Sequence, residues 1–251
     1  TRNEGRVRAL QQLRGDRADR RERVGQVRLH LQEGGRSTAK IVEAKSVSFS
    51  YDTVSPSPEP IVHDLSATIH RGDKIGIIGP NGCGKTTLLN LLLGKLHPQD
   101  GSVKHGARLE IAYFDQHRAQ LDPSATLAEA VAGGNEFVTL GDERRHIYGY
   151  LQDFLFSADT ARQPVGTLSG GERNRLLLAK LFAQPANVLV LDEPTNDLDV
   201  ETLRALEDAI EAFAGCVIVI SHDRWFLDRL ATHILAFEGD SQVEWFEGNY
   251  Q

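Results

Sequence analysis

The 251-residue chain contains no methionine, two cysteines and no long hydrophobic run. Cys83 and Cys216 lie far apart, and neither has a CxxC partner. This pattern argues against a disulfide framework or a zinc site and favours a reducing compartment. Because no stretch of about 18 apolar residues occurs, no segment is long enough to cross a bilayer as a helix. The polar, arginine-rich start carries no secretory signal, so we expect a cytoplasmic protein.

Charge is distributed unevenly along the chain. The net charge is −7, yet residues 1–36 contain ten arginines and five acidic residues, whereas the remainder contains 18 basic and 30 acidic residues. A basic arm on an acidic body points to a polyanionic partner for the arm. The chain begins at Thr1, which either removal of an initiator methionine or excision from a longer protein would explain.

The spacing of apolar residues predicts an α/β protein. Residues 1–33 lack proline and are expected to form a helix that ends at a Gly-Gly pair. A strand with Val47, Phe49 and Tyr51 on one face comes next. Its hairpin partner is expected over 61–69, beyond a proline-rich loop. The other expected elements are a strand over 74–78, a helix over 86–93, short strands over 102–104 and 109–114, a mainly helical region over 121–184, a parallel strand–helix–strand unit over 188–191, 200–213 and 217–221, and an antiparallel hairpin over 234–246.

A glycine-rich loop joins the strand and the helix expected on either side of it. It matches the pattern G-x-x-x-x-G-K-[ST], in which backbone N–H groups surround phosphate oxygens and the helix N-terminus adds its positive end. Lys85 is expected to contact the β- and γ-phosphates, and the Thr86 hydroxyl is a hard oxygen ligand for Mg²⁺. The flanking strand and helix argue against a chance glycine-rich turn. The loop consists of Gly79, Pro80, Asn81, Gly82, Cys83, Gly84, Lys85, Thr86 and Thr87.

Two further motifs carry chemistry. Asp192 ends an apolar strand and can hold Mg²⁺ through water, while Glu193 can orient and polarise an attacking water. An acidic strand end facing solvent is the alternative for this pair. Ser169 is a good helix N-cap, and Gly170 and Gly171 expose backbone N–H groups that suit an anion. A plain helix start would have the same residues.

Gln116 lies in the segment Tyr-Phe-Asp-Gln between the first two of these motifs in the chain, and Ser221-His222-Asp223 follows the last. The order of these five motifs resembles the ATP-binding cassette superfamily over residues 40–238. The resemblance implies a P-loop NTPase core that binds ATP and Mg²⁺ and hydrolyses ATP. It also implies an antiparallel β-subdomain near 40–70 and an α-helical subdomain near 120–184. In this superfamily the Ser-Gly-Gly segment caps an ATP that is bound to the opposite domain. The chain would then contain half of each of two sites and would need a second cassette.

The same resemblance assigns roles to individual residues. Gln116 would meet Mg²⁺ or the attacking water, His222 would contact the γ-phosphate, and Asp199 would lie at the dimer seam. Lys85 and Glu193 would complete the catalytic set. Tyr51 would stack on adenine, although its place on a strand face beside apolar residues equally suits a core aromatic.

Two segments, 192–199 and 221–224, resemble the ABC-F proteins, which carry two cassettes in one chain and no membrane domain. Further segments resemble the Uup branch of that family. On this resemblance the chain is a C-terminal cassette over 38–251, preceded by the end of an interdomain linker helix over 1–37. ABC-F proteins act on the ribosome, and Uup-like members are also linked with DNA. The segments that resemble the Uup branch are 1–10, 113–118, 149–156 and 171–178.

Four arginines form a stripe on the expected first helix. At about 100° per residue they fall within a sector of about 60°, and none has an acidic residue three or four positions away. Unpaired guanidinium groups suit phosphate oxygens, and a solvated helix face is the alternative. We favour RNA on the ribosome as the partner. An ATPase acting on branched DNA, or the ATPase subunit of a transporter, are the alternatives. The stripe consists of Arg14, Arg17, Arg21 and Arg28.

Overall fold

The computed structural model describes residues 38–51, 60–115, 121–141, 143–196, 198–239 and 241–248. The helix expected over 1–37 and most of the proline-rich loop lie outside the described residues. The boundary between a linker and a cassette near residue 38 therefore stays a prediction. Five residues with predicted roles also lie outside the described residues: Arg14, Arg17, Arg21, Arg28 and Gln116.

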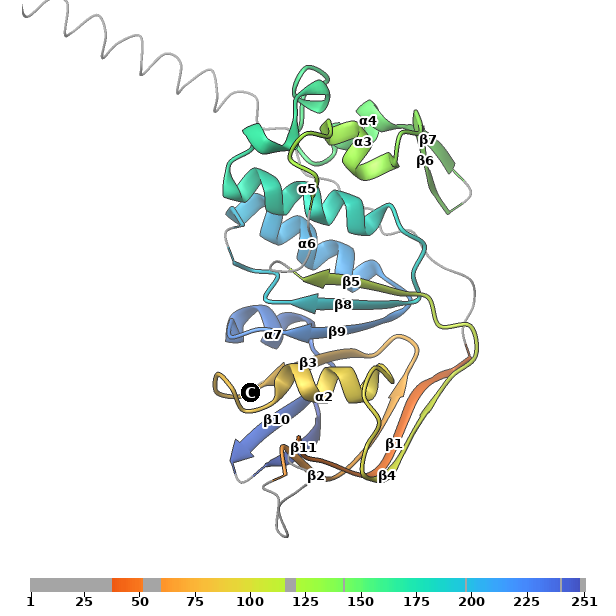
Figure 1. Cartoon of the computed structure of the whole chain (residues 1–251), viewed down its shortest axis with the longest axis vertical. Helices are drawn as coiled ribbons and strands as arrows, with labels where there is room; N and C mark the ends of the chain where they lie inside the picture. Colours follow the sequence, from red (N-terminus) through yellow and green to blue (C-terminus); the bar gives the residue numbers. More distant parts are fainter. Residues whose placement is uncertain are drawn as a thin grey trace, which may run out of the picture.

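A nine-stranded mixed sheet forms the centre of the protein (Figure 1). Its last five strands in sheet order pair in parallel with one another. The first three form the predicted antiparallel subdomain, in which β1 pairs with both β2 and β4. In sheet order the strands are β4 (Asp100–His105), β1 (Lys40–Phe49), β2 (Val62–His70), β11 (Gln242–Glu247), β10 (His233–Gly239), β3 (Lys74–Ile78), β9 (Cys216–Ile220), β8 (Val188–Asp192) and β5 (Ile111–Asp115).

The central strands are buried on both faces, as their runs of Val, Ile and Leu predict. Side chains alternate between the two faces. In β8, Leu189 and Leu191 join the core that α5 and α6 cover. Val188 and Val190 join the opposite core, which α2 covers. The helices are α2 (Lys85–Leu92), α3 (Leu127–Ala132), α4 (Ile147–Gln152), α5 (Gly170–Phe182), α6 (Val200–Ala212) and α7 (Arg224–Leu230), with 3₁₀ turns at Thr160–Arg162 and Val165–Thr167.

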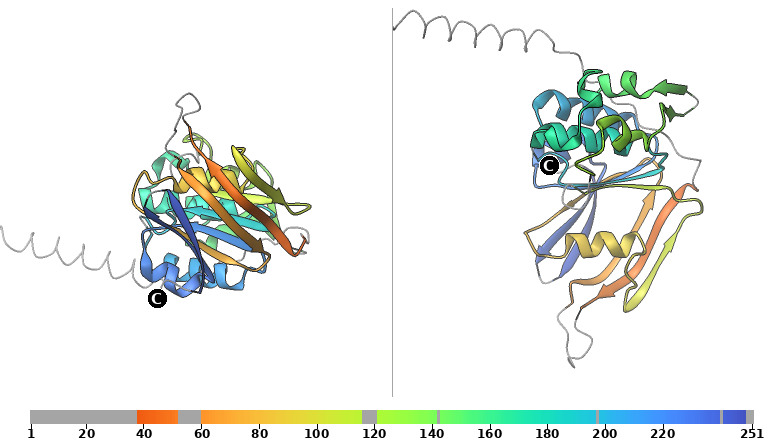
Figure 2. Two further views of the ribbon diagram at one scale, coloured as in Figure 1. Left: turned by 90° about the horizontal axis from the view of Figure 1, so that it is seen from below. Right: turned by 45° about the horizontal axis from the view of Figure 1, so that its top comes forward.

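The two predicted subdomains lie at opposite ends of the molecule. Figure 2 shows the green to teal helices, which include α3, α4 and α5, gathered at one end, and the orange to yellow strands β1, β2 and β4 at the other. Among the described helices, none is long and apolar enough to cross a membrane.

Two elements differ from the sequence prediction. The region over 121–184 is not wholly helical, because β6 (Phe137–Leu140) and β7 (Glu143–His146) pair as an antiparallel hairpin inside it. Each strand has four residues, too few for a period of two to show in the sequence. The helix α7 was not predicted. Its seven residues begin at the N-cap Asp223, whose side chain accepts a hydrogen bond from the Phe226 N–H.

Tyr51 lies outside the strand face on which it was expected. The pairing of β1 with β2 is irregular between Ala44 and Phe49, and β1 ends at Phe49. Val47 and Phe49 are buried as predicted, but Tyr51 is 62% exposed. The alternative reading of Tyr51 as a core aromatic is therefore wrong.

Candidate nucleotide site

Four parallel strands end at one edge of the sheet. In the order β3, β9, β8 and β5, each pairs in parallel with the next, so their carboxyl ends face the same way (Figure 1). The glycine-rich loop (residues 79–87) follows β3, the Asp192–Glu193 pair ends β8, and His222 follows β9. In open parallel sheets, ligands bind at this edge. We call it the carboxyl edge.

Glycine is required at two positions of the glycine-rich loop. Gly84 has φ of 112°, and a Cβ there would come within 2.3 Å of Ile61 Cγ2. Gly79 has φ of 155°, and a Cβ there would come within 2.8 Å of Cys83 Sγ and Phe237 Cβ. Gly84 is also the N-cap of α2 and offers no side chain to the first helical N–H groups. Those N–H groups have no acceptor within the helix, so the loop presents an anion-binding helix start.

The polar side chains of the loop differ in their exposure and contacts. Lys85 Nζ donates hydrogen bonds to the carbonyl oxygens of Gly79 (2.8 Å) and Pro80 (2.9 Å), which holds the ammonium group over the loop. Thr86 is exposed, whereas Thr87 is buried. The Thr87 hydroxyl lies 3.3 Å from the Tyr51 hydroxyl, so Tyr51 stands at the same edge as the loop.

One histidine connects three segments of the site. His222 Nε2 lies 3.0 Å from Asn81 Oδ1 of the glycine-rich loop and 3.5 Å from Glu193 Oε1 at the end of β8. The Glu193 N–H donates a hydrogen bond to the Ile220 carbonyl oxygen (2.8 Å), which ties this turn to β9. Glu193 has φ of 49°, a left-handed conformation that costs a non-glycine residue about 1 kcal/mol. The turn directs the Glu193 carboxylate toward His222, which follows the end of β9.

Asp192 is half-buried at the tip of β8. No group of three or more His, Cys, Asp or Glu side chains forms a ready-made metal site within the described residues. Mg²⁺ requires near-octahedral oxygen coordination. A cation held by Asp192 and Thr86 would therefore draw further ligands from phosphate oxygens and water.

The Ser-Gly-Gly segment (residues 169–171) does not join this cluster. Ser169 is the N-cap of α5 and forms a capping box, in which its hydroxyl donates to Glu172 Oε2 (2.6 Å). Gly170 is exposed, and a Cβ there would meet nothing within 4 Å. The helix α5 that this segment opens covers the opposite face of the sheet from α2, which follows the glycine-rich loop.

Two contacts tie the Ser-Gly-Gly helix to the segment after Glu193. Arg175 of α5 donates to Asp199 Oδ2 (3.0 Å), and Asn174 Nδ2 donates to the Asn196 carbonyl oxygen (3.1 Å). Burial raises the pKa of Asp199, but hydrogen bonds from Thr202 and the charge of Arg175 outweigh it and hold the pKa below its ordinary value. The segment that begins at the catalytic candidate Glu193 is thus anchored on α5.

Sequence reasoning missed two of these supporting residues. Arg175 lies in the helix that was recognised, but its distant partner Asp199 left no signal in the local pattern. Phe237 of β10 is buried beneath the glycine-rich loop, as the close approaches at Gly79 and Gly84 show. It also lines a cavity of about 370 Å³ that reaches His222. Its position in a terminal hairpin gave no reason to place it there.

The fold and the edge geometry define a P-loop ATPase of the ATP-binding cassette class. Residues 62–196, more than half of the chain, match the family described as ABC transporter, and the chain belongs to this family. It is 50% identical over 250 residues to the ATP-binding protein Uup of Escherichia coli K12, covering 100% of this chain and 39% of that protein. It is 48% identical over 250 residues to the ATP-binding protein Uup-like of Haemophilus influenzae, covering 100% of this chain and 53% of that protein.

The chain also resembles the energy-dependent translational throttle protein EttA of Escherichia coli K12, with 45% identity over 222 residues that cover 88% of this chain and 39% of EttA. The predicted ABC-F relationship is confirmed. The chain spans about two fifths of the length of Uup and EttA.

Solved structures agree with the fold. An inward-facing putative metal-chelate type ABC transporter aligns with a TM-score of 0.63 and 25% identity over 83% of both chains. A dimeric ATP-binding cassette in a post-hydrolysis state, bound to ADP and Pi, aligns with a TM-score of 0.62 and 23% identity over 82% of this chain and 98% of that one.

The contact between α5 and Asp199 predicts that the loss of Arg175 lowers ATP turnover but leaves ATP affinity unchanged. Arg175→Ala removes one ion pair that is partly exposed, so we expect a loss of about 1 kcal/mol in unfolding free energy. ATP affinity should be unchanged because Arg175 lies away from the glycine-rich loop, whereas turnover should fall because the segment after Glu193 loses its anchor. Urea unfolding, nucleotide titration and steady-state ATPase assays measure the three quantities. The control is Arg173→Ala, an exposed arginine on the same helix; equal turnover in both variants would contradict the anchoring role.

Proposed function

We propose that this chain hydrolyses Mg-ATP in a composite site shared with a second cassette. The proposal rests on the position of His222. This residue contacts Asn81 of the glycine-rich loop and also the carboxylate of Glu193, so it links the two segments. These groups lie at one edge of the sheet, while the Ser-Gly-Gly segment lies on a helix covering the opposite face from α2. A second cassette facing this edge would supply its own Ser-Gly-Gly segment, whose backbone N–H groups bind the anion.

In the proposed site, each group of the chain has one task. The glycine-rich loop and Lys85 bind the phosphates, and Tyr51, exposed beside Thr87, offers its ring to adenine. Thr86, Asp192 and Gln116 would hold Mg²⁺ together with phosphate oxygens. When bound, this cation neutralises charge on the β- and γ-phosphates.

Hydrolysis then needs a positioned water and a proton acceptor. Glu193 would accept a proton from the water as its oxygen bonds to the γ-phosphorus and the bond to the β-phosphate bridging oxygen breaks, releasing ADP and phosphate. His222, 3.5 Å from the Glu193 carboxylate, would donate a hydrogen bond to the γ-phosphate and orient the base. The Ser169–Gly171 N–H groups of the facing cassette would complete the charge-stabilising shell.

Replacement of the base should uncouple binding from hydrolysis. Glu193→Gln keeps the size of the side chain but cannot accept the proton, so ATP affinity should stay within about twofold while turnover falls by at least about 100-fold.

Lys85→Ala should instead abolish tight Mg-ATP binding, because the cation facing the β- and γ-phosphates is lost. Calorimetric titration and a phosphate-release assay distinguish the two variants. Wild-type turnover by Glu193→Gln, paired with a competent second cassette, would exclude Glu193 as the base.

We further propose that this protein acts in translation. The support is the resemblance to EttA, whose name describes a translational throttle protein, together with the four stripe arginines, which have no acidic residue three or four positions away in the sequence. Guanidinium groups without acidic neighbours suit the phosphates of ribosomal RNA. Binding to ribosomes, compared with binding to branched DNA, distinguishes this proposal from a DNA-directed role.

The stripe should make a measurable contribution to the salt dependence of ribosome binding. Changing all four stripe arginines to glutamine should weaken binding and reduce the log–log salt slope by about 0.7 to 0.9 for each lost phosphate contact. Arg8, Arg20 and Arg23 each lie four residues after an acidic residue, so their joint change to glutamine is the matched control. Circular dichroism checks that helix content is retained. Equal salt slopes for the two variants would contradict the proposal and support the alternative, that the stripe is only a solvated helix face.

A further inference from the structure

Two strongly exposed apolar side chains stand at the carboxyl edge. Trp225 is 79% exposed and Val200 is 67% exposed, the two highest values among the large apolar side chains of the described residues. Tyr51, at the same edge, is third. In the described part of the chain, no other large apolar side chain is more than 41% exposed. Exposed apolar surface is thus concentrated where the site loops lie.

Both side chains directly follow segments of the proposed site. Val200 is the first residue of α6, immediately after the N-cap Asp199, and Trp225 is the second residue of α7, three positions after His222. Both helices begin at the carboxyl edge, because each follows a strand that ends there. Val200 and Trp225 therefore lie at the same edge of the sheet as His222.

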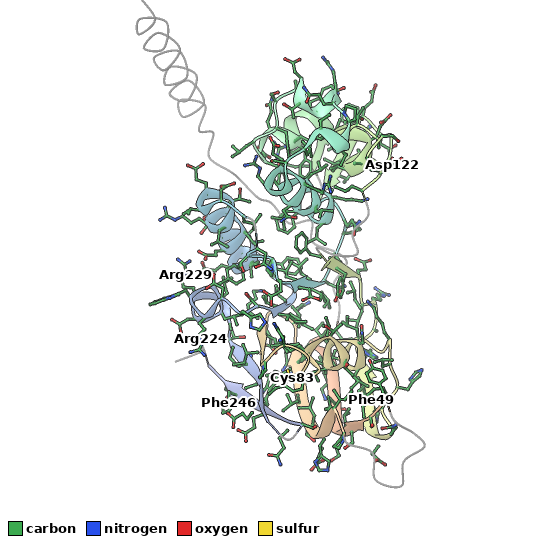
Figure 3. The ribbon with its side chains drawn as sticks, turned by 60° about the vertical axis from the view of Figure 1, so that its left-hand side comes forward. Phe49, Cys83, Asp122, Arg224, Arg229 and Phe246 are labelled. Carbon is green, nitrogen blue, oxygen red and sulfur yellow. The ribbon has the colours of Figure 1, made fainter. Side chains whose placement is uncertain are left out.

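An ion pair shows which sides of α6 and α7 face each other. Arg229 of α7 binds Glu207 of α6, so these residues mark the sides on which the two helices face each other. Val200 lies seven residues before Glu207, and Trp225 lies four residues before Arg229. Both spacings return to the same helix face, about 10 Å and about 6 Å toward the N-terminus. Figure 3 shows Arg224 and Arg229 together on α7, apart from Phe246 on the terminal hairpin.

We propose that Trp225 and Val200 form an apolar anchor that is buried against a second cassette when two cassettes close on ATP. The inference rests on the composite site proposed above. A facing cassette must cover the γ-phosphate side of the site, where Glu193 and His222 lie, and the anchor borders that side. Tryptophan is enriched among the residues that dominate protein interfaces, since it buries a large apolar area with few rotatable bonds.

Trp225 can report on its own burial, because the chain has one other tryptophan, Trp245. In a Glu193→Gln, Trp245→Phe background, adding ATP should move Trp225 emission to shorter wavelength. The shift should grow with protein concentration, in step with dimer formation followed by analytical ultracentrifugation. The probe is a second copy of this chain.

Substitution tests whether the anchor contributes to affinity. In the Glu193→Gln background, Trp225→Ala should weaken ATP-dependent self-association by about 30-fold, the effect of one strong interface residue. Val200→Ser should weaken it less. ATP affinity measured on the dilute monomer should not change in either variant. Phe246→Ala, which removes an exposed aromatic side chain away from the carboxyl edge, is the control and should leave self-association unchanged.

Each other outcome overturns the proposal in a distinct way. An ATP-dependent dimer in which Trp225 emission is constant and Trp225→Ala has no effect would exclude the anchor and leave the composite site standing. Monomer at every concentration, with ATP bound, would contradict both. A shift of Trp225 emission caused by RNA without ATP would assign the surface to nucleic acid instead.

Discussion

The parallel register of β3, β9, β8 and β5 is the constraint on which the rest of the structure depends. Parallel pairing turns four separate chain segments toward one edge, so residues up to 141 positions apart in sequence come within hydrogen-bonding distance, as Asn81 and His222 do. Burial on both faces makes this register costly to change, because a slip of one residue would exchange the side chains of the two cores. The site is precise because three of its supporting strands, β3, β9 and β8, are buried on both faces.

The two faces of the sheet also separate the two halves of the chemistry. The glycine-rich loop leads into α2 on one face, and the Ser-Gly-Gly segment opens α5 on the other. Arg175 and Asn174 connect α5 to the carboxyl edge. Their hydrogen bonds anchor the segment that begins at Glu193 to α5.

The sequence was sufficient to predict the parts governed by local rules. The glycine-rich loop, the apolar strand before Asp192 and the N-cap at Ser169 each combine a backbone requirement with a residue type that meets it. The prediction was wrong or silent where distant parts of the chain decide. Tyr51 leaves its strand face because β1 is irregular against β2. Phe237 supports the glycine-rich loop from a terminal hairpin. The hairpin β6–β7 and the helix α7 are too short for a periodic signal.

In the proposed composite site, a single cassette contains half of each of two ATP sites. The ATPase rate per mole of chain across a dilution series, with light scattering to report the oligomeric state, tests this arrangement. We expect a low rate for the isolated chain that falls further as dimer dissociates and rises when a second cassette is added, because a lone domain leaves the γ-phosphate exposed to water. A specific activity that stays high and constant down to nanomolar chain, with only monomer present, would contradict it.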